Sequence, residues 1–200
     1  MSSMQNLVSL PSSICKLKGL VKLNLLGCSK LESLPEELGD LEKLEKVDAN
    51  FTLISQPPSS IVRLNKLKLL TFAKQKSEAR VYFVFPRVNE GLFSLKHLDL
   101  SDCNLIDGGL PEDVGSLSSL EMLNLSGNNF GHFPRKHSPN LVLFKYLDLS
   151  YCKRLKELPG FMGDAKLGDF GSLSLQFNRW RTCRRHWMLI LFESVGSQWK

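Results

Sequence analysis

The sequence lacks the motifs that identify most enzymes and membrane proteins. It contains no G-x-x-x-x-G-K-[ST] loop for nucleotide phosphates. Lys166–Gly171 includes the letters D-F-G of a kinase magnesium loop, but the glycine-rich loop, the strand lysine and the H-R-D loop of a kinase are missing. No stretch approaches the roughly 20 apolar residues of a membrane span. We therefore expect a chain that is not an enzyme, needs no cofactor and has no membrane span.

Metal and redox signals are also scarce among the five cysteines and four histidines. No C-x-x-C pair occurs, and Cys183-x-x-His186 alone is too little for a zinc site. The first ten residues lack the basic segment and the apolar run of a secretion signal. We expect no metal site and a cytoplasmic location, with the nucleus as an alternative and the extracellular space as a less favoured one.

What the sequence does contain is a repeat that is marked by proline. Seven of the nine prolines recur at intervals of 24, 23, 28, 25, 23 and 25 residues: Pro11, Pro35, Pro58, Pro86, Pro111, Pro134 and Pro159. Nine residues after most of them a phrase of the form L-x-x-L-x-L begins, as in Leu20–Leu25, Leu95–Leu100 and Leu120–Leu125. Six such phrases in register indicate a repeat protein.

This period and this phrase are the signature of the leucine-rich repeat. The alternating part of each phrase predicts a short strand, and the strands of successive coils would stack into a parallel sheet. The apolar residues that follow each proline lie three apart, which favours a short helical or 3₁₀ turn. We expect an α/β solenoid of about six to seven repeats, curved, with the sheet on the concave face and the turns on the convex side.

A small polar or thiol side chain follows each predicted strand by three residues. In this fold such a side chain turns inward and satisfies backbone groups that are left free as the chain leaves the strand. We assign this structural corner role to Cys28, Cys103, Asn128 and Cys152, and the same slot holds Thr52 and Gln75. Three of the five cysteines are thereby explained without redox or metal chemistry.

The outward positions of the predicted strands form columns across the sheet, and solenoids bind partners on such a face. The first column varies from basic to aromatic and is the better candidate for specificity. The second column is mostly Asn or Asp, for which plain solvation is the alternative. The candidate binding residues are Lys22, Asn24, Lys46, Asp48, His97, Asp99, Met122, Asn124, Tyr146 and Asp148.

The two ends are less regular than the middle. The chain begins inside a repeat, so we expect the solenoid to span residues 1–178 of a fragment or truncated product, with a last strand near Leu173–Leu175. Residues 179–200 hold all three tryptophans and four arginines, and they break the repeat. This tail reads as an artefact of frame or splicing, or as a native basic tail for a membrane surface or nucleic acid.

The wording of the repeats resembles one family. The phrases Leu7–Leu31, Leu100–Pro111 and Lys153–Gly160 are similar to repeats of intracellular plant disease-resistance receptors that also carry a Toll/interleukin-1-receptor domain and a nucleotide-binding domain. The resemblance covers residues 7 to about 163. It implies protein partners: a pathogen effector, an accessory host protein or the nucleotide-binding switch domain. It implies no nucleic-acid partner.

Two other interpretations stay open. Gly109–Leu117 approaches the form found in extracellular receptor-like proteins, for which the sequons at Asn50 and Asn124 would be glycosylation sites. A free-standing repeat scaffold or adaptor without an immune role is the third interpretation. Sugar-dependent changes in mass would support the extracellular alternative.

Overall fold

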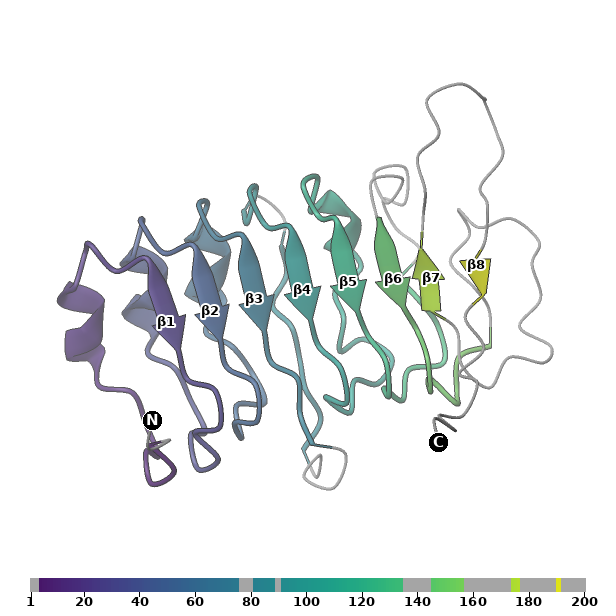
Figure 1. Ribbon diagram of the computed structural model, residues 1–200, viewed down its shortest axis with the longest axis horizontal. Helices are drawn as coiled ribbons and strands as arrows, with labels where there is room; N and C mark the ends of the chain where they lie inside the picture. Colours follow the sequence, from purple (N-terminus) through teal and green to yellow (C-terminus); the bar gives the residue numbers. More distant parts are fainter. Residues whose placement is uncertain are drawn as a thin grey trace, which may run out of the picture.

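Six short strands stack side by side in chain order and form the spine of the molecule (Figure 1). The computed structural model describes residues 4–75, 81–88, 91–134 and 145–156, and the backbone of 174–176 and 190–191. The strands are β1 (Lys22–Asn24), β2 (Lys46–Asp48), β3 (Leu69–Thr71), β4 (His97–Asp99), β5 (Met122–Asn124) and β6 (Tyr146–Asp148). All neighbours among these six pair in parallel. The predicted leucine-rich-repeat solenoid is confirmed.

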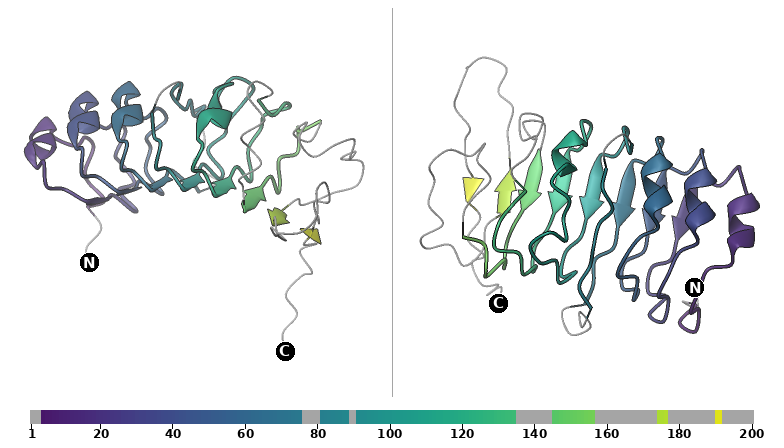
Figure 2. Two further views of the ribbon diagram at one scale, coloured as in Figure 1. Left: turned by 90° about the horizontal axis from the view of Figure 1, so that it is seen from above. Right: turned by 180° about the vertical axis from the view of Figure 1, so that it is seen from behind.

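Short 3₁₀ turns lie on the side opposite the sheet, as the apolar spacing predicts (Figure 2). They are η1 (Ser12–Lys16), η2 (Glu36–Asp40), η3 (Ser59–Arg63) and η4 (Val114–Ser116). Proline directly precedes the first three, since its φ is already near the helical value and it has no N–H to leave unsatisfied. Each turn ends at a leucine whose N–H bonds back into the turn, at Leu17, Leu41, Leu64 and Leu117.

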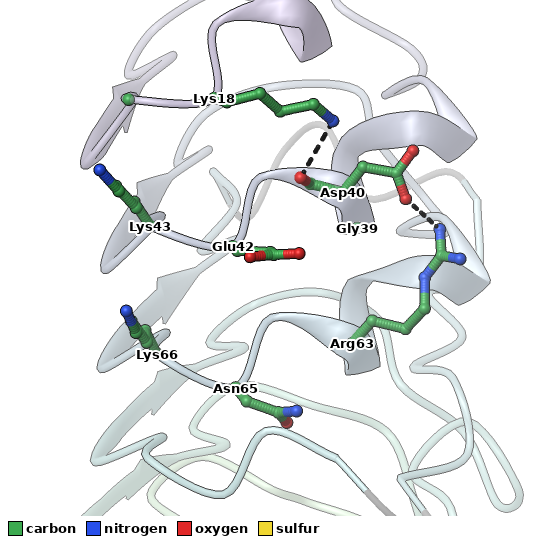
Figure 3. Close-up of a pocket in the computed structure, with 9 residues that line it drawn as sticks. Lys18, Gly39, Asp40, Glu42, Lys43, Arg63, Asn65 and Lys66 are labelled. Atoms are coloured by element: carbon green, nitrogen blue, oxygen red, sulfur yellow. Dashed lines mark hydrogen bonds and ion pairs between the residues drawn. The ribbon is translucent and has the colours of Figure 1, made fainter.

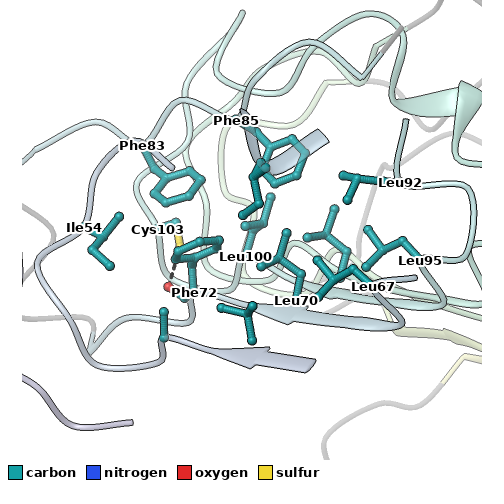
Figure 4. Close-up of a cluster of buried hydrophobic side chains, with 14 of the residues drawn as sticks. Ile54, Leu67, Leu70, Phe72, Phe83, Phe85, Leu92, Leu95, Leu100 and Cys103 are labelled. Carbon is teal, nitrogen blue, oxygen red and sulfur yellow. Dashed lines mark hydrogen bonds between the residues drawn. The ribbon is translucent and has the colours of Figure 1, made fainter. Parts of the chain in front are cut away.

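The core runs unbroken between the sheet and the turns. The central residue of every strand from β1 to β6 is buried, and the leucines of the L-x-x-L phrases pack against it from the other side. In the middle coils phenylalanine adds to this packing: the rings of Phe72 and Phe83 lie 5.4 Å apart, with Phe85 beside them (Figure 4). Phe83 and Phe85 thus add two further rings to the core of these coils.

The end of the sheet departs from the repeat. A strand does lie where the last one was expected, β7 (Ser174–Gln176), but it pairs antiparallel with β6, and β8 (Ile190–Leu191) pairs antiparallel with β7. A further coil would have returned the strand in the parallel direction, so β7 is not the next coil of the same solenoid. The proposed boundary at residue 178 and the nature of the tail fall largely on residues outside the described ranges.

Within the described residues, no helix has the length and apolar character needed to cross a bilayer.

Candidate functional site

The first column of the sheet has the predicted register. Cα pairing joins the first residues of β1 to β6 in a continuous row: Lys22, Lys46, Leu69, His97, Met122 and Tyr146. Lys22, Lys46 and Met122 are exposed, and the other three are partly buried. The row changes from basic to apolar and aromatic along the sheet. The backbone groups of this row are bonded within the sheet, so its side chains are not needed to hold the strands together.

The second column has a structural task that the sequence interpretation missed. Each Asn or Asp at the end of a strand accepts a hydrogen bond from the backbone N–H two residues later, over 3.0 Å for Asn24, 3.1 Å for Asp48, 2.9 Å for Asp99, 3.0 Å for Asn124 and 2.8 Å for Asp148. Such Asx turns replace the ladder bond that is lost as the chain bends. These five side chains therefore shape the exit from the strand whether or not a partner touches them.

Charges in this second column also alternate. The sequence of the column is Asn24, Asp48, Thr71, Asp99, Asn124 and Asp148, so a neutral side chain separates each carboxylate from the next. The neutral neighbours contact the carboxylates: the Thr71 hydroxyl lies 3.2 Å from Asp48 Oδ1, and Asn124 Nδ2 lies 3.3 Å from Asp99 Oδ2. Because strands are roughly 4.8 Å apart, three adjacent carboxylates would repel one another strongly.

A third row of charges, just before the strands, links neighbouring coils by ion pairs. Glu45 binds Lys68 at 2.9 Å, and Glu121 binds both Lys96 at 3.0 Å and Lys145 at 2.5 Å. The hydrogen bonds from Lys145 and Lys96 lower the pKa of Glu121 to about 2. The slot holds Glu45, Lys68, Lys96, Glu121 and Lys145 in successive coils, so each glutamate has a lysine in the next coil.

The corner side chains bind carbonyl oxygens inside the solenoid. Cys103 Sγ lies 3.1 Å from the oxygen of Phe72, Cys152 Sγ lies 3.2 Å from that of Leu125, and Asn128 Nδ2 lies 2.8 Å from that of Leu100. Each of these oxygens belongs to the preceding coil, so the corners tie adjacent coils together. Burial raises the pKa of the Cys103 thiol to about 12 and that of Cys152 to about 11, which keeps both thiols protonated as donors.

The corners at Cys28 and Gln75 differ from each other. Cys28 is buried at its corner, as expected. Gln75, however, is exposed, so its assignment to the same inward slot is wrong. The Lys74 ammonium instead reaches the oxygens of Thr52 at 2.5 Å and Ile54 at 2.7 Å, and it satisfies the carbonyls of the preceding coil in place of a corner side chain.

The described residues form shallow hollows on the surface. One of them, about 980 Å³, lies beside the turns of the first three coils and is lined by polar residues that include Lys18, Asp40, Glu42 and Arg63. In it, Lys18 Nζ donates to the Asp40 backbone oxygen and Arg63 pairs with the Asp40 carboxylate at 2.9 Å (Figure 3). No group of three metal-binding side chains is present among the described residues.

Comparisons with known proteins agree with this geometry. The family described as Leucine Rich Repeat matches residues 94–117 and 119–141. TMV resistance protein N of Nicotiana glutinosa is 60% identical over 157 residues, which are 78% of this chain and 14% of that protein. Disease resistance-like protein DSC1 of Arabidopsis thaliana is 38% identical over 155 residues, 78% of this chain and 12% of that protein. The chain thus spans a small part of the length of these relatives.

Among solved structures, the leucine-rich repeat domain of the type III effector XopL has a similar fold. The TM-score is 0.58 at 20% sequence identity, and the match covers 80% of this chain and 54% of that one. At this identity the likeness concerns the fold alone.

Proposed function

Because the chain belongs with the leucine-rich-repeat regions of plant disease-resistance proteins, we propose that it is a recognition module that binds a protein partner on the outer face of its sheet. The observation that carries this proposal is the first column of that face. The side chains of the second column form the Asx turns, and the corner side chains point inward. The first column presents charged, apolar and aromatic side chains in one continuous row.

The partner is a pathogen effector, an accessory host protein or the nucleotide-binding switch domain of a receptor. Solenoids recognise proteins over broad, extended faces, and the row from Lys22 to Tyr146 is part of such a face. The proposal assigns no catalysis to the chain, and it places the chain in the cytosol, where such a switch domain would work. A fluorescent fusion at either end tests the compartment.

The sequons of the extracellular alternative lie at side chains that are already bonded to the sheet. The Asn50 side-chain oxygen accepts a hydrogen bond from the Ala73 N–H at 2.7 Å, and the hydroxyl of Thr52 is buried and bound to the Ala49 oxygen at 2.8 Å. The Asn124 side-chain oxygen holds the turn at Ser126. A glycan on either asparagine would project from the same face of the sheet as the first column and would obstruct a protein partner there.

Binding assays with purified components test the proposal. The chain would be titrated with the nucleotide-binding domain of TMV resistance protein N and, separately, with individual TMV proteins. Met122→Glu should weaken the observed complex by about tenfold or more, since it places a charge in the centre of the face. Lys16→Glu on the opposite side, in η1, serves as the matched control. Loss of binding with Lys16→Glu alone would place the interface on the turns and contradict the proposal.

A further inference from the structure

Lysines in the same slot of adjacent coils repel one another unless acids bind them, because neighbouring strands are roughly 4.8 Å apart. Before the strands, Lys68 and Lys96 occupy one slot of adjacent coils, and each binds a glutamate: Lys68 binds Glu45 at 2.9 Å and Lys96 binds Glu121 at 3.0 Å. In the second column, carboxylates alternate with neutral residues. Like charges of neighbouring coils are thus paired or kept apart in these two rows.

A set of lysines in the first three coils lacks such ion pairs. Lys22 and Lys46 are direct partners in the register of β1 and β2, so two ammonium groups occupy the same slot of adjacent strands. Lys43 and Lys66 likewise occupy equivalent places in consecutive coils, after Leu41-x and Leu64-x. All four are exposed, and none of their ammonium groups has a hydrogen bond or an ion pair with a residue that the structure describes. We call these four residues the lysine cluster.

The local surroundings do not neutralise the lysine cluster. Glu45 is an acid on which the charges of Lys22 and Lys46 act, but Lys68 already binds it at 2.9 Å. The pKa of Glu45 is lowered first by the hydrogen bond from Lys68 and then by the charges of Lys68, Lys46 and Lys22, so the cations already share this one carboxylate. Asp40 is likewise bound to Arg63. Lys43 and Lys66 extend on the side away from Asp40 and Arg63 (Figure 3).

We propose that the lysine cluster is a docking surface for an acidic segment of a partner protein, whose carboxylates supply ion pairs to these four ammonium groups. Lys22 and Lys46 repel one another in the free protein, and unlike Lys68 and Lys96 neither is held by an ion pair with a described residue. This repulsion is relieved when carboxylates bind between the ammonium groups. The inference rests on the proposed function and adds to it the chemistry of the partner and the end of the face that it contacts.

The acids within the patch favour a peptide over nucleic acid. Glu42, Glu45 and Asp48 lie among the lysines, and they would repel an unbroken line of phosphates at several points. A peptide can place carboxylates at alternate residues and leave neutral side chains opposite these acids. The lysine cluster itself contains no aromatic side chain on which a base could stack, and such stacking normally supports single-strand binding.

A fluorescein-labelled peptide in which glutamate alternates with serine provides the binding test. It should bind the full chain saturably, and the Lys22→Gln/Lys46→Gln double variant should weaken binding by about tenfold or more at low salt. The control is Lys153→Gln/Lys156→Gln, which removes the same charge from exposed sites at the far end of the solenoid and should change affinity less than about twofold. Equal losses in the two double variants, preferred binding of a single-stranded oligonucleotide of equal charge, or absence of saturable peptide binding would each overturn the inference.

A second measurement tests the repulsion itself and needs no ligand. Thermal midpoints of the wild type, Lys22→Gln, Lys46→Gln and the double variant form a cycle that isolates the pairwise term. We expect a repulsive coupling equivalent to about 1–4 °C at low salt that fades as salt is added. A coupling of zero at low salt would show that Lys22 and Lys46 do not repel each other and would contradict the inference. If the Lys22→Gln/Lys46→Gln protein still binds the switch domain or viral protein of the previous section as tightly as wild type, the inference fails while the proposed function stands.

Discussion

Gly39 is the position where a single methyl group should disturb the packing of two coils. It lies buried in η2, and a Cβ placed there would sit 2.3 Å from the backbone oxygen of Ser60 and 2.7 Å from the Ser60 Cβ, both in η3. An ordinary contact between carbon and oxygen is roughly 1 Å longer than the first distance. A backbone oxygen cannot rotate away as a side chain can, so η2 and η3 must move apart. The Gly39 N–H would also lose its 3.3 Å contact with the Ser60 hydroxyl.

We expect Gly39→Ala to lower the free energy of unfolding by about 1–3 kcal/mol, the usual range for overpacking of a tight interface. Urea unfolding followed by circular dichroism measures it. The matched control is Gly19→Ala, because an added Cβ at Gly19 meets no atom within 4 Å. That variant should be neutral or gain up to about 1 kcal/mol through reduced freedom of the unfolded chain. Equal stability of the two alanine variants would refute the packing of η2 against η3.

Three further predictions concern the core, the ion pairs and the corners. Leu123→Ala should lower the free energy of unfolding by about 2–5 kcal/mol, because it opens a cavity at a fully buried site. His97→Ala in the outward slot should lower it far less. Denaturation measures both, and similar losses of stability would show an error in the register. Because the pKa of Glu121 is about 2 in the folded chain and near 4.5 in the unfolded one, its stabilisation should be present above pH 4.5 and be lost as the pH falls toward 2. Glu121→Gln should therefore be less stable than wild type at neutral pH, and a gap that persists near pH 2 in urea titrations would argue against the pairing. Cys103 should react with a thiol reagent only after unfolding, and rapid labelling of the native protein, located by mass spectrometry, would exclude the buried corner.

The architecture was predictable because it depends on local periodicity. Leu23, Val47 and Leu98 alternate with polar neighbours, and the same phrase recurs at a nearly constant interval, so strand, register and inward face follow from counting. The 3₁₀ turns after Pro11, Pro35 and Pro58 follow in the same way. Each of these features needs only residues of one coil.

The candidate site was predictable only in part. The row from Lys22 to Tyr146 follows from the register, but the task of Asp48 and Asp99 in the strand-exit turns depends on how their side chains rotate toward the backbone. Gln75 fits the corner slot by counting and yet lies exposed, while the Lys74 ammonium reaches the Thr52 and Ile54 oxygens of the preceding coil. Which of two adjacent side chains turns toward the preceding coil is decided by contacts between coils.

By itself the sequence determined the order of the coils that carry β1 to β6 and which leucines face inward, because a hydrophobic period can be satisfied in only one way once the coils stack. Only the tertiary structure decided which charges neutralise each other and which lysines lack a partner, since these depend on distances between residues some 20 to 25 positions apart, such as Glu45 and Lys68 or Glu121 and Lys96. The antiparallel pairing of β7 with β6 was likewise decided only by the tertiary structure. Strand direction at the end of the sheet follows from the path of the chain between strands, on which the leucine phrase carries no information.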